Sequence, residues 1–339
     1  MHSARSKTMK TEVKTKRASY WSRGFLLSAF LWLGLFWIGE APAQKVRVAM
    51  PAKSMTFLNF YVGDKFGVYK AEGLEVSLEV IKTEVGIAGM VAGEVDYTSA
   101  IGSAMRAAAS GVPIKATMFT MDRVLIYMFA KPTIKSIEEL KGGKTVATTG
   151  LVATPTYAAK VMARARGLNP DDLVFIATGD VANSLAALQS GAADVAMLSI
   201  PFNFKADELG FRNLGSAVDY LQTPFAGVAA ADAKIKANSA QVKRMIRATL
   251  KGMAFTKDPA NQEKVTGLLM DEFKLDRKTA ALSLREIIKV FTKDGTTPED
   301  AVKTEIKEIR EQAKLKGEIP TSQLVDYRLL EEVLAETKR

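Results

Sequence analysis

The chain has 339 residues, of which 47% are hydrophobic and 25% are charged. This balance excludes a disordered or fibrous protein and is enough for about two globular domains. No cysteine is present, which excludes disulfides, thiolate metal sites, thiol nucleophiles and a lipid-anchored cysteine. The formal net charge is +10 at pH 7, and the only histidine is His2.

Residues 1–43 have the organisation of a secretory signal peptide. A basic region with seven Lys and Arg residues is followed by an apolar run over 25–39 and by Ala41-Pro42-Ala43. The small residues of this triplet stand at the two positions that a signal peptidase reads. The apolar run is shorter than the about 20 residues of a membrane-spanning helix. We therefore expect cleavage after Ala43 and a periplasmic protein; the alternative is an uncleaved amino-terminal anchor.

Removal of this segment changes the charge and the chemistry that remain. Residues 1–43 hold seven of the 47 basic residues and two of the 37 acidic ones, so the mature chain carries a net charge of +5. This value gives little support for a nucleic-acid partner. It suits an anionic ligand, or it serves only to keep the protein soluble. Loss of His2 leaves no imidazole for a catalytic triad or a metal site.

From Lys45 onward, short β-branched runs alternate with longer Ala-rich stretches. This alternation is typical of βαβ units and predicts a largely parallel sheet. The first predicted strands are 46–50, 75–81 and 97–100, and the first predicted helices are 57–70, 87–92 and 103–110. After Ala237 the pattern is almost wholly helical. The helices predicted there are 241–256, 261–273, 277–291, 298–315 and 321–337, with the charged residues Lys303, Glu305, Lys307 and Glu308 on a solvated face.

The order of these elements recurs about a hundred residues later. Lys45-Val-Arg-Val-Ala-Met corresponds to Lys144-Thr-Val-Ala-Thr-Thr, an offset of 99, and Gly93-Glu-Val-Asp corresponds to Gly191-Ala-Ala-Asp, an offset of 98. Two copies of one α/β unit predict two similar lobes with a ligand-binding crevice between them. We expect lobe 1 to comprise 45–122 and 226–339, with the carboxy-terminal helices. Lobe 2 then comprises 123–225, and the hinge crossings fall near 123–131 and 220–228.

Several segments carry a family resemblance. Phe66-Gly-Val-Tyr-Lys-Ala-Glu-Gly-Leu-Glu-Val76, together with the Gly-x-x-Asp of each half, resembles the substrate-binding proteins grouped as thiamine-precursor and alkanesulfonate receptors. The resemblance spans about Lys45 to Ala230. It implies a type II periplasmic binding protein fold, with two Rossmann-like lobes joined by a hinge of two crossings and a helical carboxy-terminal tail. It also implies delivery of a small-molecule ligand to an ABC transporter permease in the cytoplasmic membrane.

The candidate ligand-binding residues lie in loops that follow predicted strands and open helices, where unpaired backbone N–H groups favour an anion. Ser or Thr in such a loop can donate to the ligand, or can simply cap the helix, and the two roles can coexist. Small residues leave room for the ligand, although ordinary strand-to-helix turns use them as well. The candidates are Lys53, Ser54, Met55, Phe57, Ser99, Ile101, Gly102, Arg123, Thr149, Gly150, Thr154, Ser199 and Phe202.

Lys53 and Arg123 are the candidates for direct charge recognition, since a guanidinium can hold a carboxylate or sulfonate in bidentate fashion. The alternative is that each pairs with a neighbouring carboxylate on a solvated face, and that the ligand is a neutral heterocycle. Aromatic side chains can wall an apolar pocket or pack in the core. Those considered for the wall are Phe57, Phe60, Phe119, Phe202 and Phe225, with Met121.

These observations predict a monomeric binding protein that performs no chemistry and uses neither a cofactor nor a metal. Two alternatives remain. The closed, ligand-bound form can dock on a membrane sensor rather than on a permease, because both use the same ligand-shifted equilibrium. An enzyme similar to the thiamine-pyrimidine synthases has a related fold, but the resemblance implies His and Cys features that the mature chain lacks.

Overall fold

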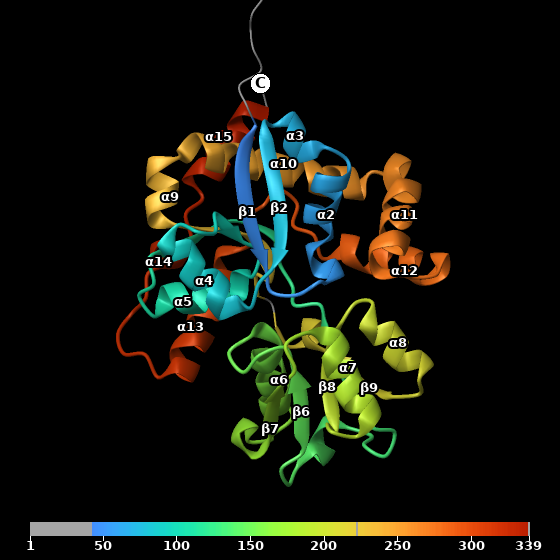
Figure 1. The fold of residues 1–339 in the computed structure, drawn as a ribbon. Coiled ribbons are helices and arrows are strands. Elements are labelled where there is room, and N and C mark those ends of the chain that lie inside the picture. Colours follow the sequence, from blue (N-terminus) through green and yellow to red (C-terminus); the bar gives the residue numbers. More distant parts are fainter. Residues whose placement is uncertain (1–42, 222, 338–339) are drawn as a thin grey trace, which may run out of the picture. The chain divides into compact units, whose positions relative to one another are not determined.

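The computed structural model describes residues 43–221 and 223–337. The predicted signal peptide, apart from Ala43, lies outside the described residues. Two five-stranded sheets with helices on their faces make up the described chain (Figure 1). The α/β architecture with two sheets is thus confirmed. Within residues 43–337, no described helix combines the length and the apolar character that crossing a membrane requires.

The first sheet, with its helices, is called lobe 1. Parallel pairs join β1 to β2 and to β3, whereas β10 runs antiparallel to both β3 and β4. Its strands, in spatial order, are β2 (Leu74–Val80), β1 (Gln44–Met50), β3 (Tyr97–Thr98), β10 (Ala226–Ala231) and β4 (Ile114–Met121).

The second sheet, called lobe 2 with its helices, repeats this topology. Parallel pairs join β6 to β7 and to β8, and β5 runs antiparallel to β8 and β9. Its strands, in spatial order, are β7 (Val174–Ala177), β6 (Thr145–Thr148), β8 (Val195–Ser199), β5 (Ile126–Ala130) and β9 (Arg212–Ser216). The expectation of largely parallel sheets is therefore wrong, because each sheet is mixed. The reversed strands β5 and β10 are the first strands after the chain passes from one sheet to the other.

The chain passes between the two sheets twice. It leaves β4 and enters β5 through residues 122–125, and it leaves β9 and enters β10 through residues 217–225. Each sheet therefore contains a strand whose predecessor along the chain lies in the other sheet. We call these two segments, which link the sheets covalently, the first and the second crossing.

The internal repeat is confirmed by one backbone arrangement that both lobes share. Asp96 accepts a hydrogen bond from the backbone N–H of Arg47 (2.8 Å), and Asp194 accepts one from that of Thr145 (3.1 Å). The N–H of each aspartate in turn donates to the carbonyl of the same partner. In both cases the offset between the two copies is 98, so the offset of 99 expected for the first strands is wrong by one residue. A lysine completes each site, since Lys131 donates to Asp194 and Lys234 to Asp96.

Helices surround both sheets, and most lie close to their predicted places. The tail helices end within a few residues of the predicted bounds. The helices of lobe 1 are α2 (Leu58–Lys65), α3 (Val68–Ala71), α4 (Thr83–Ala92), α5 (Ile101–Ala109), α9 (Asp232–Ala237), α10 (Ser239–Lys257), α11 (Gln262–Phe273), α12 (Arg277–Lys289), α13 (Glu299–Ala313), α14 (Thr321–Leu324) and α15 (Arg328–Thr337). The helices of lobe 2 are α6 (Thr154–Ala165), α7 (Val181–Ser190) and α8 (Phe202–Glu208).

Two predicted helices are interrupted. The helix expected over 57–70 divides at Gly67, whose φ of 69° lies in the left-handed region that glycine adopts without a steric penalty. The helix expected over 321–337 divides at Val325, which forms a β-bridge with Ala116 at the edge of the first sheet. Tertiary contact with the sheet thus overrides the helical pattern at this point.

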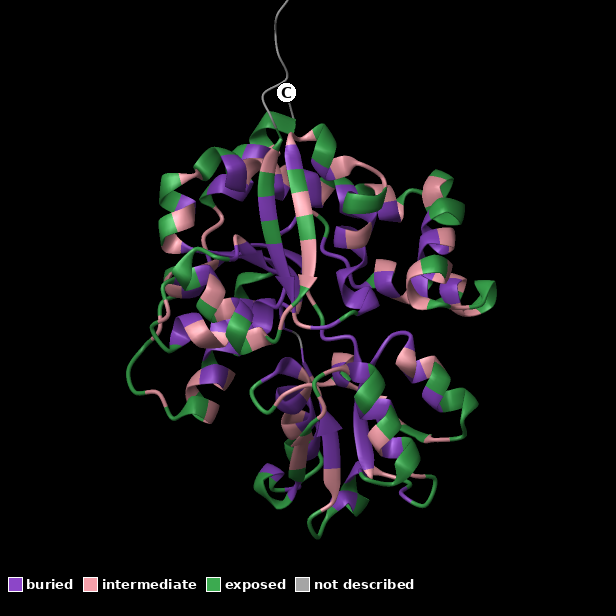
Figure 2. Cartoon of the chain, in the orientation of Figure 1, coloured by how far each residue is buried: buried purple, intermediate pink, exposed green. Residues whose placement is uncertain are grey.

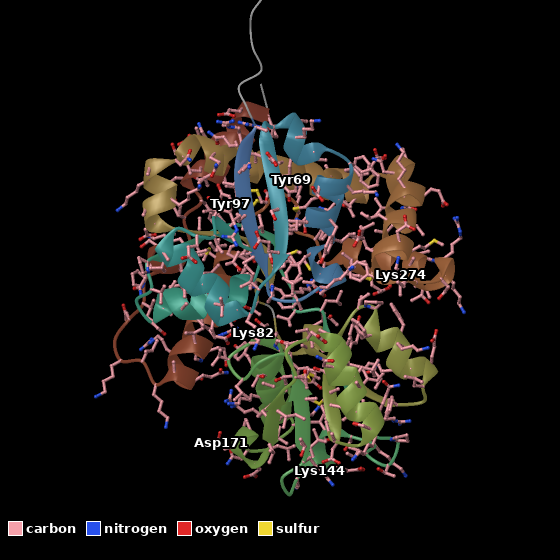
Figure 3. The ribbon with its side chains drawn as sticks, viewed as in Figure 1. Tyr69, Lys82, Tyr97, Lys144, Asp171 and Lys274 are labelled. Carbon is pink, nitrogen blue, oxygen red and sulfur yellow. The ribbon has the colours of Figure 1, made fainter. Side chains whose placement is uncertain are left out.

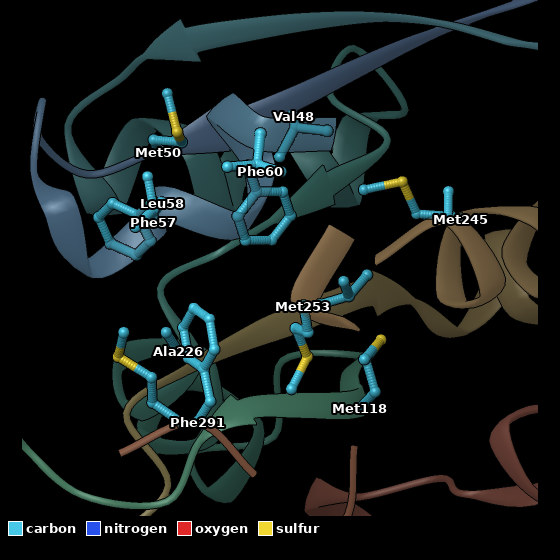
Figure 4. Close-up of a cluster of buried hydrophobic side chains, with 14 of the residues drawn as sticks. Val48, Met50, Phe57, Leu58, Phe60, Met118, Ala226, Met245, Met253 and Phe291 are labelled. Atoms are coloured by element: carbon cyan, nitrogen blue, oxygen red, sulfur yellow. The ribbon is translucent and has the colours of Figure 1, made fainter. Parts of the chain in front are cut away.

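The main core fills the space between the first sheet and the helices that cover it. Strands β1 and β10 are mostly buried, and the outer faces of the helices are exposed (Figure 2). Phe60 of α2, Met245 and Met253 of α10 and Val48 of β1 belong to this core (Figure 4). Tyr69 and Tyr97, labelled in Figure 3, are both buried in this core. Separate apolar clusters fill lobe 2.

We predict that Gly227→Ala destabilises the protein strongly. A Cβ at this position of β10 would lie 2.1 Å from the carbonyl oxygen of Met118 and 2.9 Å from the Cα of Phe119. Backbone atoms cannot yield as a side chain can, so the cost should reach at least about 3 kcal/mol. Gly267→Ala in α11 is the matched control, because nothing lies within 4 Å of its Cβ. It should stabilise the protein by about 0.5–1 kcal/mol, as measured by urea unfolding.

We predict a pH-dependent effect for Asp194→Asn. The hydrogen bond from Lys131 holds the pKa of Asp194 below its usual value of 3.8. A lowered folded-state pKa contributes stability that is present above the unfolded value and is lost as the pH falls through the folded one. The substitution should therefore cost about 1–2 kcal/mol at pH 7, and less in urea titrations below about pH 3.5. Asp172→Asn, an exposed carboxylate of the same lobe, should cost little at either pH. An equal cost for Asp194→Asn at both pH values would contradict the assignment.

Candidate functional site

A cavity lies where the two lobes meet, and we call it the interlobe cavity. Both lobes contribute to it in similar measure, and in this narrow form its cavity volume is about 60 Å³. Lobe 1 supplies Pro51, Ala52, Ser54, Thr56, Phe57, Thr83, Ala100 and Ser103; lobe 2 supplies Ile126, Thr149, Ala153, Thr154, Pro155, Val181, Met197 and Ser199; the second crossing supplies Phe225. The cavity lies beyond the carboxyl ends of β1, β3, β6 and β8, where open α/β sheets bind ligands.

The wall of the cavity is apolar with interspersed hydroxyl groups. No Lys, Arg, Asp or Glu belongs to its lining, and seven of the lining residues are Ser or Thr. Small-molecule sites commonly have this composition, in which a few placed polar groups orient a ligand inside an apolar wall. Ser54 and Ser199 join the two lobes directly, since their hydroxyl oxygens lie 3.1 Å apart within hydrogen-bonding distance.

The loop after β1 shows how a cap and a cavity residue coincide. Ser54 caps the short 3₁₀ helix Met55–Phe57, and its hydroxyl accepts a hydrogen bond from the N–H of Thr56 (3.3 Å). The same side chain faces the cavity and reaches Ser199. Met55 turns into the core of lobe 1 and is fully buried, whereas Phe57 lines the cavity and packs on that core. The two roles foreseen for Ser54 therefore coexist.

The loop after β6 opens α6 in a different way. The residue before the helix is Ala153, and no side chain caps the helix at its amino terminus. Thr154 is the first helical residue rather than a cap. Thr156 holds the loop, because its hydroxyl bonds to the carbonyl of Gly150 and to Thr148, both at 2.7 Å. Ala153, Thr154 and Pro155 consequently form one side of the cavity.

The positive charge beside the cavity belongs to Arg106 of α5, which sequence analysis did not select. Its Nη2 donates to the hydroxyl oxygens of Ser103 and Thr154, both at 3.0 Å, so it joins lobe 1 to lobe 2. Its Nη1 lies 3.6 Å from Oε1 of Glu305 in α13. The guanidinium also lies over the ring of Tyr157, 5.5 Å from the centroid.

Glu305 corrects the prediction of a solvated face on α13, because its side chain is only 1% exposed. Its other carboxylate oxygen accepts a hydrogen bond from the hydroxyl of Thr223 in the second crossing. Burial raises the pKa of Glu305, and Arg106 opposes that rise. Burial also lowers the pKa of Arg106, again opposed by its partner. The charges of the pair therefore depend on each other.

The other predicted site residues are divided between the cavity and other places. Ser54, Phe57, Thr149, Thr154 and Ser199 line the cavity. Ser99 and Ile101 are buried within lobe 1, and Gly102 lies against Thr154. Gly150 lines an adjoining hollow, as does Lys82, which is labelled in Figure 3. Phe202 packs on lobe 2. Their roles in ligand binding stay predictions.

Neither predicted charge-recognition residue lines the cavity. Lys53 forms an ion pair with Glu272 (3.2 Å) and lies over the ring of Phe273. Arg123 is exposed on the first crossing. Of the aromatic candidates, Phe57 and Phe225 line the cavity. Phe60 and Phe119 are fully buried in lobe 1, as is Met121. A search of every strand end would have found Thr83, which follows β2; no local signal marks Met197, Val181 or Ile126.

The comparisons with known proteins agree with this architecture. A family model described as NMT1/THI5 like matches residues 54–262, more than half of the chain. The chain belongs to the NMT1/THI5-like family. It is 26% identical to the riboflavin-binding protein RibY of Chloroflexus aurantiacus over 223 residues. That match covers 63% of this chain and 62% of RibY, so it spans less than two thirds of the relative's length.

Solved structures show that this member of the NMT1/THI5-like family has the type II periplasmic binding protein fold, as the resemblance implied. A protein of Bordetella bronchiseptica RB50 superposes with a TM-score of 0.77 at 18% identity, over 88% of this chain and 99% of that one. The periplasmic aliphatic sulphonate binding protein SsuA of Escherichia coli superposes with a TM-score of 0.65, also at 18% identity, over 84% and 92%.

An enzyme also shares the fold. The desulfurization enzyme DszB superposes with a TM-score of 0.58 at 12% identity, over 87% of this chain and 99% of that one. The fold alone therefore does not separate binding from catalysis, and the residues of the site must decide. Among residues 43–337, no cluster of three or more His, Cys, Asp or Glu side chains is placed to hold a metal ion.

Proposed function

We propose that this protein is the solute-binding component of an ABC importer, that it is exported to the periplasm, and that it acts as a monomer. It captures a small organic ligand in the interlobe cavity and presents it to a permease in the cytoplasmic membrane. The observation that carries the proposal is a cavity shared by two lobes at the ends of their strands. The similarity to RibY and SsuA, which are both binding proteins, supports it. Strand β1 begins at Gln44, directly after the predicted cleavage site.

The cavity wall favours a ligand with an apolar body and a few hydrogen-bonding groups. Phe57, Ile126, Met197 and Phe225 supply apolar surface, and the Ser and Thr side chains supply the polar contacts. An organic anion such as a sulfonate or carboxylate fits if hydroxyls and backbone N–H groups hold its oxygens. A neutral heterocycle fits the same wall. Lys53 and Arg123 are not needed in either case.

Hinge closure is the mechanism that this arrangement supports. Ligand meets the residues of one lobe first, and rotation about the two crossings brings the residues of the other lobe onto it. Such a ligand shifts the equilibrium toward the closed form, because only that form offers both halves of the wall. The lining contains no carboxylate, imidazole, thiol or amine, so it lacks the usual general acids, bases and activated nucleophiles. We therefore propose binding without chemistry.

The proposal predicts a rise in melting temperature when the purified protein is screened against alkanesulfonates, aromatic carboxylates, pyrimidines and riboflavin. A ligand at a hundred times its Kd stabilises the native state by about 2.7 kcal/mol, which raises the melting temperature by several degrees. At least one class should do so. If no member of any class changed the melting temperature, a small-molecule role for the cavity would be contradicted.

The hits of that screen should depend on the cavity and not on the exposed charges. Thr83→Trp at the cavity mouth should lower affinity at least tenfold, because the indole occupies space that the ligand needs. Val85→Trp is the matched control, because Val85 lies two residues further along the same helix and is 60% exposed. It should change affinity less than about twofold. Lys53→Met and Arg123→Met should behave like the control. A tenfold loss of affinity in either variant would show that the substituted residue takes part in ligand binding.

A further inference from the structure

The strongest unexplained feature of the molecule is the cluster around Arg106, in which Glu305 is buried and the Arg106 side chain is 19% exposed. Four elements meet there: α5 supplies Arg106, α6 of lobe 2 supplies Thr154 and Tyr157, α13 supplies Glu305, and the second crossing supplies Thr223. We call Arg106 and Glu305 the interlobe pair. The pair thus contacts lobe 1, lobe 2 and the second crossing.

We propose that Arg106, backed by Glu305, is a positioning residue of the ligand site. It draws Thr154 of lobe 2 onto Ser103 of lobe 1 and thereby holds the interlobe cavity closed. The inference rests on the proposed function, since a closed cavity matters only if a ligand occupies it.

The contacts of Arg106 distinguish the closed arrangement from an open one. Nη2 reaches Ser103 within its own helix and Thr154 across the lobe boundary, each at 3.0 Å. Both hydroxyls line the interlobe cavity. Separation of the lobes keeps the contact with Ser103 and breaks those with Thr154 and Tyr157, so the guanidinium would lose its lobe 2 partners. Those two contacts therefore favour the closed form alone.

The geometry of the interlobe pair argues against a purely stabilising role. Nη1 of Arg106 and Oε1 of Glu305 are both buried, and neither has a hydrogen-bond partner among the described residues. They lie 3.6 Å apart, beyond a good hydrogen bond. A buried ion pair with incomplete hydrogen bonding recovers little of its desolvation cost. Replacing such a pair by apolar residues often leaves the free energy of unfolding unchanged or raises it. Retention of such a pair beside a ligand cavity points to a positioning role.

Gly102 provides independent support for a close approach at this point. A Cβ there would lie 3.0 Å from Oγ1 of Thr154 and 3.5 Å from Nη1 of Arg106. The position has no unusual φ, so the glycine is not needed for the backbone conformation. Its absent side chain instead leaves space for Thr154 to reach the guanidinium. A second contact, Arg164 to Glu308 at 3.8 Å, joins the same helices α6 and α13.

The test measures lobe closure without any ligand. Because the chain contains no cysteine, Val91→Cys in lobe 1 and Val174→Cys in lobe 2 give two unique labelling sites, both about half exposed. Distances between spin labels at these sites report the closed and open populations of the full chain. In Arg106→Met the closed population should fall at least threefold.

Two further variants separate positioning from simple loss of folding. Arg106→Met leaves Glu305 buried and unpaired, which can itself destabilise the fold. The double variant Arg106→Met with Glu305→Met removes both charges, so urea stability should recover while the lobes stay open. Lys303→Met removes an exposed ion pair of the same helix α13 and should leave the distances unchanged.

Several outcomes would overturn the proposal. These are an unchanged closed population in the double variant, an equal opening in Lys303→Met, and a parent chain with no closed population. The thermal-shift screen is independent of this measurement. If the protein bound a ligand but the label distances in the double variant were unaltered, the role of Arg106 would be contradicted and the proposed function would not. If the screen gave no hit, the proposed function would be contradicted and the distance result would still hold.

Discussion

The insertion of β10 and β5 into their sheets is the constraint on which the rest of the structure depends. Each strand enters its sheet in the reversed direction, directly after a crossing. The chain therefore binds the lobes together at two adjacent points and leaves the carboxyl ends of β1, β3, β6 and β8 facing the junction. The close contact of Gly227 with the backbone of β4 shows how tightly this insertion is packed. The position of the interlobe cavity at the junction follows from the topology.

Local patterns predicted much of this fold. Strand β1, the helical tail and the repeat of the Gly-x-x-Asp motif all follow from residue periodicity and spacing, and Asp96 and Asp194 make equivalent backbone bonds. The reversal of β10 and the bridge of Val325 to Ala116 could not be predicted from the sequence, because both depend on contacts between distant segments. Such tertiary contacts leave no periodic signature in the residues that make them.

The candidate site was predictable in its loops and not in its charges. Ser54 and Thr149 follow strands and Ser199 ends one, so strand-end reasoning found them. Proximity along the chain also selected Lys53 and Arg123, which lie outside the cavity lining. Arg106 stands in the middle of an Ala-rich helix, and its acidic partner Glu305 stands in a tail that resembled a solvated surface. Their pairing depends on the packing of α13 against α5, which no local pattern encodes.

The direction of the hydrogen bonds between Arg106 and its two hydroxyl partners is also fixed. A guanidinium has only donors, so the oxygens of Ser103 and Thr154 must act as acceptors toward it. Each hydroxyl keeps its own proton to offer elsewhere, and both groups border the cavity. That side of the wall can therefore donate hydroxyl protons to a carbonyl, sulfonyl or ring-nitrogen lone pair. Such a wall would offer hydrogen-bond donors to the proposed ligand without placing a charge in contact with it.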